Sequence, residues 1–490
     1  MGPAIVPGGC DHPERGSGVF RSLAPVVWVW MATLAAVPGG VAADEGDVPP
    51  RAHRIEVREQ GSGWPVPLVE LETTHRKILV TDNAGVVAFD LPELMGVETW
   101  LHVRSPGHEV GRDGFGYRGV RLTPEPGGHT VIEVERTAIA RRLGRLTGAG
   151  LFAESQKLGR ERDWRESGVM GADTVQVAPY RGRLFWLWGD THLPHYPLGI
   201  FHSSAATTVA GPLASLEPPV RMVFDYFRDP QSGRPREVGR MPGDGPTWIT
   251  GLASVPDVDG IERLVGTYSK IEPPLDAYEW ALCVWDDEAA RFEPLRVIWR
   301  RDAEGVPAKP PALPTGPPAL WVDDDGREWL LYGNPLPRLQ APATFEGLTD
   351  PGQWRELEPQ ESFRDAASGD EVRPHTGAIA WSADLERWVA VFMQWFGSPS
   401  VFGEIWYAEA DSPFGPWGPA VKVLSHDAYT FYNPRMHPYL VPEGAGVILF
   451  EATYTEQFVG DPVVPTARHD YNQVLYRIDL DDPRLEPARQ

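Results

Sequence analysis

The stretch TVQVAPYRGRLFWLWGD, residues 174–190, decides how this chain folds. Its first part alternates apolar and polar residues up to a tight turn at Tyr180-Arg-Gly-Arg. The chain then returns as the aromatic run Leu184-Phe-Trp-Leu-Trp. Alternation on both sides of a glycine-containing turn predicts two antiparallel strands. The second strand ends at Gly189-Asp190, so a carboxylate directly follows a buried strand.

The same hairpin pattern recurs four more times along the chain. Each copy has an apolar strand, a short polar turn and a returning strand, and the copies begin at Gly251, Ala319, Gly377 and Met436. Five repeats of one β unit favour a five-bladed β-propeller, because each blade buries its faces against its neighbours. Large aromatic side chains suit such contacts, so most of the 19 tryptophans are assigned to packing between blades.

Residues 52–136 predict a smaller β-sandwich ahead of the propeller. Alternation at His53-Arg-Ile-Glu-Val-Arg and a hairpin over residues 77–89 indicate its strands. The segment resembles the transthyretin-like, carboxypeptidase regulatory-like domain in Pro65-Val-Pro-Leu-Val-Glu-Leu, Thr81-Asp82, Gly85 and Phe89. That resemblance implies a spacer or a binding adjunct, and its scattered histidines give no reason to assign chemistry to it.

The segment that joins the two predicted domains reads as a helical linker over residues 137–158. Ile139, Leu143 and Leu146 lie at positions i, i+4 and i+7, a spacing typical of an amphipathic helix. The sequence therefore predicts an all-β chain with a small β-sandwich, one short linking helix, and a five-bladed β-propeller over residues 165–482.

The first 43 residues have the pattern of a secretory signal peptide. Arg15 and Arg21 precede the apolar run 23–37, and Val41-Ala-Ala supplies small residues for cleavage before Asp44. The predicted location is secreted or periplasmic, with membrane contact only if the segment stays uncut as an anchor. Cleavage leaves Cys283 as the one cysteine, so no internal disulfide can form.

The charge of the chain limits its partners. Lysine and arginine number 45 against 68 aspartates and glutamates, a net charge of −23, which argues against nucleic acid or an anionic membrane surface as a general partner. The sequence has no His-x-His or Glu-x-x-His cluster, so neither a metal nor another cofactor is predicted.

Propeller topology predicts which polar side chains share one end of the molecule. In an antiparallel blade the start of the first strand, the end of the second and the start of the third open on the same face, where the long loops gather. Four acids at such positions are the predicted catalytic residues: Asp173, Asp190, Glu404 and Glu451. The residues predicted to bind substrate are Arg373, His375, Gln394, Tyr432, Asn433, Arg435 and Asn472.

Three short stretches look like five-bladed propeller glycoside hydrolases. Gly171-Ala-Asp-Thr and the run from Gly182 to Asp190-Thr are similar to the endo-D-arabinanase group, and Ile405-Trp-Tyr-Ala-Glu-Ala-Asp-Ser-Pro-Phe-Gly-Pro-Trp is similar to the arabinanase and β-xylosidase group. The resemblance implies that Asp173 and Asp190 are paired carboxylates. Pro318-Ala-Leu-Trp in the third blade offers no acid, which leaves Glu404 or Glu451 to assist.

The leading hypothesis is an exported carbohydrate-active enzyme that hydrolyses glycosidic bonds of a polysaccharide or oligosaccharide. Such chemistry needs two carboxylates, one ionised and one protonated. Aromatic side chains would stack on the sugar rings, with candidates Tyr196, Tyr226, Trp395, Tyr432 and Tyr454. Two alternatives stay open: a non-catalytic propeller that binds a glycan or a protein, and a lyase that uses Arg373, His375 and Tyr432.

Overall fold

The computed structural model describes residues 51–195, 203–303, 307–398, 400–456 and 469–489. The predicted signal peptide and Tyr196 lie outside these residues. No helix within the described ranges is long and apolar enough to cross a membrane.

Two four-stranded sheets form the β-sandwich that precedes the propeller. One has the order β4 (Val86–Phe89), β1 (His53–Glu59), β8 (His129–Arg136) and β6 (His108–Glu109). The other has the order β3 (Ile78–Val80), β2 (Glu70–Thr73), β5 (Thr99–Arg104) and β7 (Gly119–Leu122), with a 3-10 turn at Pro92–Leu94. Alternate residues of both sheets, among them Ile55, Leu71 and Leu101, are fully buried in one apolar core.

Five further sheets form the blades of the propeller. The first contains β10 (Gly171–Ala172), β11 (Gln176–Tyr180), β12 (Arg183–His192), β13 (Ser203–Val209) and β14 (Asp225–Tyr226). The second contains β15 (Thr247–Pro256), β16 (Glu262–Glu272), β17 (Asp276–Asp286) and β18 (Arg291–Arg300). The third contains β19 (Ala319–Val322), β20 (Glu328–Gly333), β21 (Pro337–Pro342) and β22 (Arg355–Glu356).

The last two blades follow a small ribbon of β23 (Phe363–Arg364) and β24 (Glu371–Val372). The fourth contains β25 (Pro374–Ser382), β26 (Arg387–Gln394), β27 (Glu404–Ala410) and β28 (Val421–Ser425). The fifth contains β29 (Thr430–Met436), β30 (Val447–Thr455), β31 (Asn472–Asp479) and β9 (Arg141–Arg145). Short helices are α1 (Ala153–Lys157), α2 (Phe345–Thr349) and 3-10 turns at Pro351–Gln353, Pro438–Leu440 and Pro483–Arg489.

The all-β prediction of a sandwich and a five-bladed propeller is confirmed.

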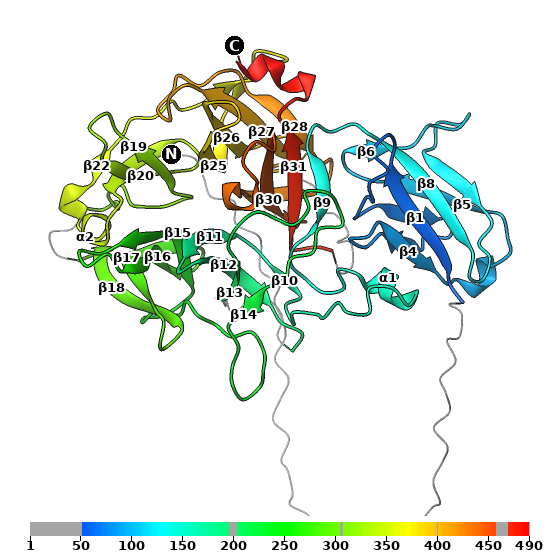
Figure 1. Cartoon of the computed structure of the whole chain (residues 1–490), viewed down its shortest axis with the longest axis horizontal. Helices are drawn as coiled ribbons and strands as arrows, with labels where there is room; N and C mark the ends of the chain where they lie inside the picture. The colour runs from blue at the N-terminus through cyan, green and yellow to red at the C-terminus, as the bar shows by residue number, and fades with distance from the viewer. Residues whose placement is uncertain (1–50, 196–202, 304–306, 399, 457–468, 490) are drawn as a thin grey trace, which may run out of the picture. The chain divides into compact units, whose positions relative to one another are not determined.

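The predicted helical linker over residues 137–158 is wrong in its first part, because the segment with the amphipathic spacing, residues 139–146, contains strand β9. β9 pairs antiparallel with β31 (Figure 1). A segment that precedes the first blade in the sequence thus forms the outer strand of the last blade. Ile139 packs in a core with the fourth and fifth blades, whereas Leu143 and Leu146 pack in a core with the first and fifth. Pairing with β31 therefore overrides the local helical spacing. The short helix of this region is α1, farther along the chain.

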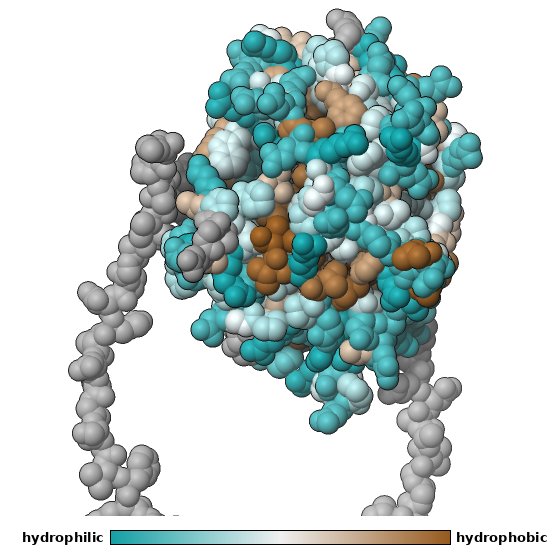
Figure 2. Space-filling model, turned by 90° about the vertical axis from the view of Figure 1, so that its left-hand side faces the viewer, coloured by the Kyte–Doolittle hydropathy of each residue, from teal (hydrophilic) through white to brown (hydrophobic). Residues whose placement is uncertain are grey.

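Aromatic side chains fill the contacts between blades, as the sequence predicts. Trp186 and Trp188 are fully buried, and they pack in one core with Leu440 and Leu449 of the fifth blade. Among the described tryptophans only Trp381 and Trp395 are exposed. Figure 2 shows a face that is mostly hydrophilic, with hydrophobic side chains confined to small patches.

Cys283 is a core residue of the second blade. Its side chain is fully buried, its thiol donates to the carbonyl oxygen of Gly266 at 3.5 Å, and burial raises the pKa of the thiol. These surroundings suppress the reactive thiolate form.

Candidate active site

Asp173 and Asp190 lie next to each other at one end of the first blade. Ala172 of β10 and Thr191 of β12 are paired, and the backbone N–H of Asp173 donates to the carbonyl oxygen of Asp190 at 3.3 Å. Both aspartates are half-buried. A Cβ at Gly189 would lie 2.4 Å from Asp173 Oδ1, so the carboxylate occupies space that only glycine leaves free.

The two carboxyl groups have strongly raised pKa values. Burial raises the pKa of Asp173 to about 6, against hydrogen bonds to its carboxylate from Tyr471 and Thr174 that favour the ionised form. Burial, together with the neighbouring Asp173 charge, raises the pKa of Asp190 to about 8. The aspartate pair therefore holds one proton near pH 7, and this proton resides mainly on Asp190.

Strained backbone surrounds the aspartate pair. Thr174, Asn433 and Tyr471 have φ angles of 47°, 52° and 60°, in the left-handed region that side chains other than glycine rarely adopt. Asn433 Nδ2 donates to Thr174 Oγ1 at 2.7 Å, and the Thr174 N–H donates to Thr453 Oγ1 at 3.2 Å. Strain of this kind costs about 1–3 kcal/mol per residue and clusters at functional sites.

The strands are irregular at the positions where the predicted site residues occur. The first strand of blade 1 is interrupted between β10 and β11, at Asp173-Thr174. The register of β29 shifts between Tyr432 and Arg435, and that of β25 shifts between Pro374 and Thr376. Such bulges turn side chains out of the regular alternation, and they are common next to active sites.

Two tyrosines face the aspartate pair. Burial and then the charges of Asp173 and Asp190 raise the pKa of Tyr471, and burial and the charge of Asp173 raise the pKa of Tyr432 to about 12. The Tyr471 ring stacks on His192 with a centroid distance of 4.8 Å. Burial lowers the pKa of His192, so this imidazole is neutral at pH 7.

An aromatic wall formed by His375, Trp395, Phe396, Phe402 and Tyr432 stands beside the aspartate pair. The His375 ring lies 4.4 Å from Trp395, 4.6 Å from Phe402 and 6.5 Å from Tyr432, measured between centroids. Burial lowers the pKa of His375 to about 4, so its ring is neutral. Trp395 and Phe396 are 45% and 63% exposed, and Phe396 has a φ angle of 53°. The wall therefore presents the aromatic rings of Trp395 and Phe396 to solvent.

The structure thus brings together five predicted site residues: Asp173, Asp190, His375, Tyr432 and Asn433. Gln394 is the last residue of β26, and it pairs with Pro374 of β25. It is therefore close to His375, which follows Pro374, and to Trp395, which follows Gln394. Gln394 Oε1 is buried and forms no hydrogen bond with the described residues.

Glu451 does not lie at the mouth where it was predicted. The strand β30 runs on to Thr455, so Glu451 lies mid-strand and its side chain is fully buried between the fifth and first blades. Its Oε1 is 2.9 Å from Nε2 of His437, whose ring packs against Trp186 at 5.2 Å. The apolar run that precedes Glu451 does not reveal where the strand ends.

Glu404 begins β27 as predicted, but its carboxylate is engaged within the fourth blade. The side chain is buried, and Oε1 accepts a hydrogen bond from Lys422 Nζ at 2.5 Å. Lys422 in turn lies over the Trp406 ring at 4.9 Å. This ion pair links β27 to β28, which indicates a structural role.

Three other predicted binding residues have partners that hold them in the fold. Arg373 is exposed and pairs with Glu371 at 3.2 Å. Arg435 is buried near the end of β29, because this strand begins at Thr430, and its Nη2 donates to the carbonyl of Val177 at 2.9 Å. The buried Asn472 donates to the carbonyl of Asp470 at 2.7 Å.

Comparison with known proteins gives structural likeness without a sequence match. No protein-family model and no curated protein matches this chain. An exo-1,5-α-L-arabinanase from a bovine ruminal metagenomic library is 9% identical over 64% of this chain and 94% of its own, with a TM-score of 0.37. An N-acetylgalactosamine deacetylase from F. plautii is 11% identical over 66% of this chain and 94% of its own, with a TM-score of 0.36. A GH43 endo-arabinanase from Bacillus licheniformis is 12% identical over 62% and 93%, with a TM-score of 0.33. Likeness at this level does not identify the reaction of this chain.

Sequence reasoning missed Thr174 and His192 as parts of the site. Tyr471 directly precedes the third strand of blade 5, so propeller topology assigns it to the same mouth, although the sequence gives it no role. His192 lies two residues after Asp190 in β12, so strand alternation could have placed both side chains on one face. Nothing in the sequence signals the left-handed backbone at Thr174.

Metal ligands are not grouped anywhere in the part of the chain that the structure describes. No set of three or more histidine, cysteine, aspartate or glutamate side chains is close enough to hold an ion there.

Proposed function

We propose that this chain is a glycoside hydrolase with Asp173 and Asp190 as its paired carboxylates. The observation that carries the proposal is that two half-buried aspartates lie on adjacent paired strands, joined by the backbone hydrogen bond from Asp173 to Asp190, and that burial raises their pKa values to about 6 and about 8. Pairs whose environments separate their pKa values provide an acid and a base at the same pH. Hydrogen bonds from the strained residues Thr174 and Tyr471 hold the Asp173 carboxylate in place.

The roles of the two aspartates follow from their protonation. Protonated Asp190 donates its proton to the glycosidic oxygen as the bond to the anomeric carbon breaks, and the leaving sugar departs as an alcohol. Ionised Asp173 stabilises the positive charge that develops on the sugar ring, either as the nucleophile or as the base that activates water. Water supplies the hydroxyl group of the second product and restores the proton to Asp190.

The substrate that this site favours is an uncharged glycan. The exposed rings of Trp395 and Phe396 suit the apolar faces of sugar rings. Among the residues predicted to bind substrate, Arg373 is the arginine closest in sequence to Trp395 and Phe396. It forms an ion pair with Glu371. A glycan rich in carboxylates or sulfates would meet the Asp173 charge without a free cation among the predicted residues. We also propose that the protein is exported, on the basis of residues 1–43.

Digestion of a panel of neutral polysaccharides tests this proposal. Wild type should release oligosaccharides from at least one of them, and Asp173→Asn and Asp190→Asn should each lower the rate by roughly 10²–10⁴-fold. Asp411→Asn is the matched control, because this aspartate is 92% exposed on the fourth blade. Release that survives both substitutions would refute the assignment.

A non-catalytic glycan-binding propeller is the second candidate function. The observation that favours it is that Glu404 and Glu451 are engaged by Lys422 and His437, so neither is free to assist the pair. Saturable binding of a glycan without release, and with equal affinity in Asp190→Asn, would establish this function in place of hydrolysis.

A further inference from the structure

A row of aromatic rings lies on the outer face of the sandwich, and the proposed reaction does not use it. Leu101 and Val103 of β5 point into the sandwich core, so the alternate residues Trp100 and His102 lie on the opposite face of the sheet. The His102 ring lies 5.7 Å from Trp100 and 5.7 Å from Tyr117, measured between centroids. Trp100, His102 and Tyr117 form the sandwich strip.

The pairing of β5 with β7 fixes the position of the strip. Trp100 pairs with Arg121, and His102 pairs with Gly119. A Cβ at Gly119 would lie 2.4 Å from Cζ2 of Trp100, so the indole lies against backbone that only glycine leaves uncovered. Side chains that are held in place before binding lose little conformational freedom when a ligand binds.

Tyr117 is the most accessible ring of the strip. Its side chain is 58% exposed, and Phe115 in the preceding turn is 90% exposed. Asp113 Oδ1 accepts hydrogen bonds from the backbone N–H groups of Phe115 and Tyr117, both at 2.9 Å, which orders this turn. The Tyr117 hydroxyl forms no hydrogen bond within the described residues. The strip therefore combines apolar ring surface with a free, exposed hydroxyl group.

Two arginines beside the strip have no carboxylate partner. The Arg121 guanidinium carbon lies 5.3 Å from the centroid of the Trp100 ring, and Arg121 is exposed. Arg112 is also exposed, and its Nη1 donates to the carbonyl of Gly116 at 2.9 Å. Neither arginine forms an ion pair with any residue in the described ranges.

The acids near the strip do not cancel these two charges. Glu70 and Glu72, the acids in the four strands of this sheet, pair with Arg104 at 3.3 and 2.7 Å. The Asp113 carboxylate orders the turn and offsets one arginine charge. The uncompensated charge beside the sandwich strip is therefore positive, on a chain whose net charge is −23.

We propose that the sandwich strip binds an acidic polysaccharide. Arg121 pairs with the carboxylate of a uronic acid residue, because a guanidinium group matches a carboxylate with two parallel hydrogen bonds. The rings of Tyr117 and Trp100 contact the apolar faces of neighbouring sugar rings. β5 lies at the side of the sandwich away from the propeller (Figure 1), and at about 0.15 M salt charges act over about 8 Å, so the acids of the propeller do not repel this ligand.

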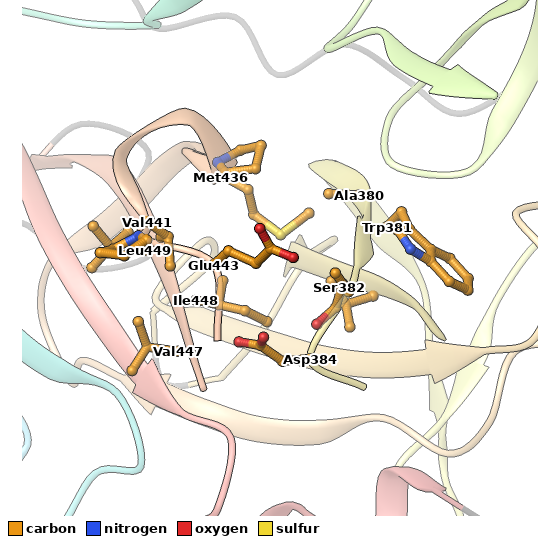
Figure 3. Close-up of a pocket in the computed structure, with 14 residues that line it drawn as sticks. Ala380, Trp381, Ser382, Asp384, Met436, Val441, Glu443, Val447, Ile448 and Leu449 are labelled. Atoms are coloured by element: carbon orange, nitrogen blue, oxygen red, sulfur yellow. The ribbon is translucent and has the colours of Figure 1, made fainter. Parts of the chain in front are cut away.

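Two places on the propeller that a ligand can reach carry acids instead. The mouth holds Asp173 and Asp190. A hollow of about 250 Å³ between the turn after β25 and the turn before β30 has Asp384 and Glu443 as its charged lining residues (Figure 3). Carboxylates at both places disfavour an acidic ligand. Binding of an acidic polysaccharide therefore reports on the sandwich strip, whether or not the aspartate pair hydrolyses glycans.

Calorimetric titration of the full chain with polygalacturonate tests the proposal. One matched probe is the same polymer with its carboxyl groups reduced to alcohols, and the other is poly-L-glutamate, which carries carboxylates without sugar rings. Polygalacturonate should bind saturably, and both other probes should bind at least about threefold more weakly. Equal binding of the reduced polymer would overturn recognition of the carboxylate, and equal binding of polyglutamate would overturn recognition of the sugar. Absence of saturable polygalacturonate binding would overturn the site.

Two pairs of variants locate the site. Arg121→Gln and Tyr117→Ala should each weaken polygalacturonate binding by at least about threefold. Arg58→Gln and Trp381→Ala are the controls, because Arg58 is an exposed arginine of the other sandwich sheet and Trp381 is 48% exposed on the fourth blade. Equal loss in the controls, or unchanged binding in both test variants, would overturn the assignment.

Asp190→Asn separates this proposal from the proposed reaction. This variant should bind polygalacturonate as tightly as wild type does, even if neither protein hydrolyses any glycan. Loss of polygalacturonate binding in Asp190→Asn would place the site at the mouth and overturn its assignment to the sandwich strip.

Discussion

At the residue scale, the raised pKa values of Asp173 and Asp190 affect folding as well as chemistry. A carboxyl group whose pKa is raised in the folded state keeps its proton where the unfolded chain has lost it. For Asp190 this interval runs from the ordinary aspartate pKa of 3.8 to about 8, and for Asp173 it ends at about 6. The contribution of these groups to stability is full below the interval and declines as pH rises through it.

Asp190→Asn should therefore make stability less sensitive to pH. We expect the free energy of unfolding of wild type, relative to the variant, to fall between pH 4 and pH 8 by up to about 1 kcal/mol per pH unit. Urea denaturation of both proteins at several pH values measures the difference between their free energies of unfolding. Titrating groups that behave alike in the two proteins do not contribute to this difference. A difference that grows with pH in favour of wild type would show that the Asp190 pKa is not raised.

At the element scale, the short strand β9 closes the propeller. It adds the outer strand of blade 5 from residues that precede blade 1, so the first and last parts of the propeller share one sheet. Leu143 of β9 is fully buried in the core that also contains Trp186 and Leu475. The ring of blades is thus joined by backbone pairing and by an apolar contact.

Leu143→Ala should destabilise the chain by about 2–5 kcal/mol, because it removes buried methyl groups and leaves a cavity. Leu320→Ala is the matched control in β19, where the side chain is 55% exposed, and it should change stability by less than about 0.5 kcal/mol. Urea denaturation measures both. Equal effects of the two substitutions would show that β9 does not close the ring in solution.

The elements also show how far sequence reasoning reaches. Hairpins such as β11–β12 and β25–β26 were predictable, because alternation and turn residues are local signals. β9 was not, because its partner β31 lies more than 300 residues away in the sequence. The aspartate pair followed from strand topology, whereas Glu451 failed because the end of β30 depends on pairing with β31. The left-handed residue Thr174 depends on contacts with Asn433 and Thr453, which no local pattern encodes.

At the scale of the whole molecule, Arg142 connects the sandwich to the propeller. Its guanidinium group is buried and donates from Nε to the carbonyl of Pro67 at 2.8 Å, from Nη1 to the carbonyl of Pro106 at 3.1 Å, and from Nη2 to Ser105 Oγ at 2.6 Å. The backbone of Arg142 itself belongs to β9 of the propeller. The described residues of the sandwich and the propeller also belong to one compact unit. We expect the sandwich and the propeller to unfold together.

Calorimetric unfolding of wild type should therefore show one transition, and Arg142→Ala should lower its temperature and separate it into two. The substitution leaves buried carbonyl oxygens of the sandwich without their donor, at a cost of about 1–3 kcal/mol for each group that stays dry. Arg58→Ala is the control, because this arginine is an exposed residue of β1 that pairs with Glu56 within the sandwich. Two transitions already present in wild type would show that Arg142 does not couple the two parts. A single transition at an unchanged temperature in Arg142→Ala would mean that other contacts, such as the hydrogen bond from Asn83 Nδ2 to the Arg145 carbonyl at 2.9 Å, hold them together without it.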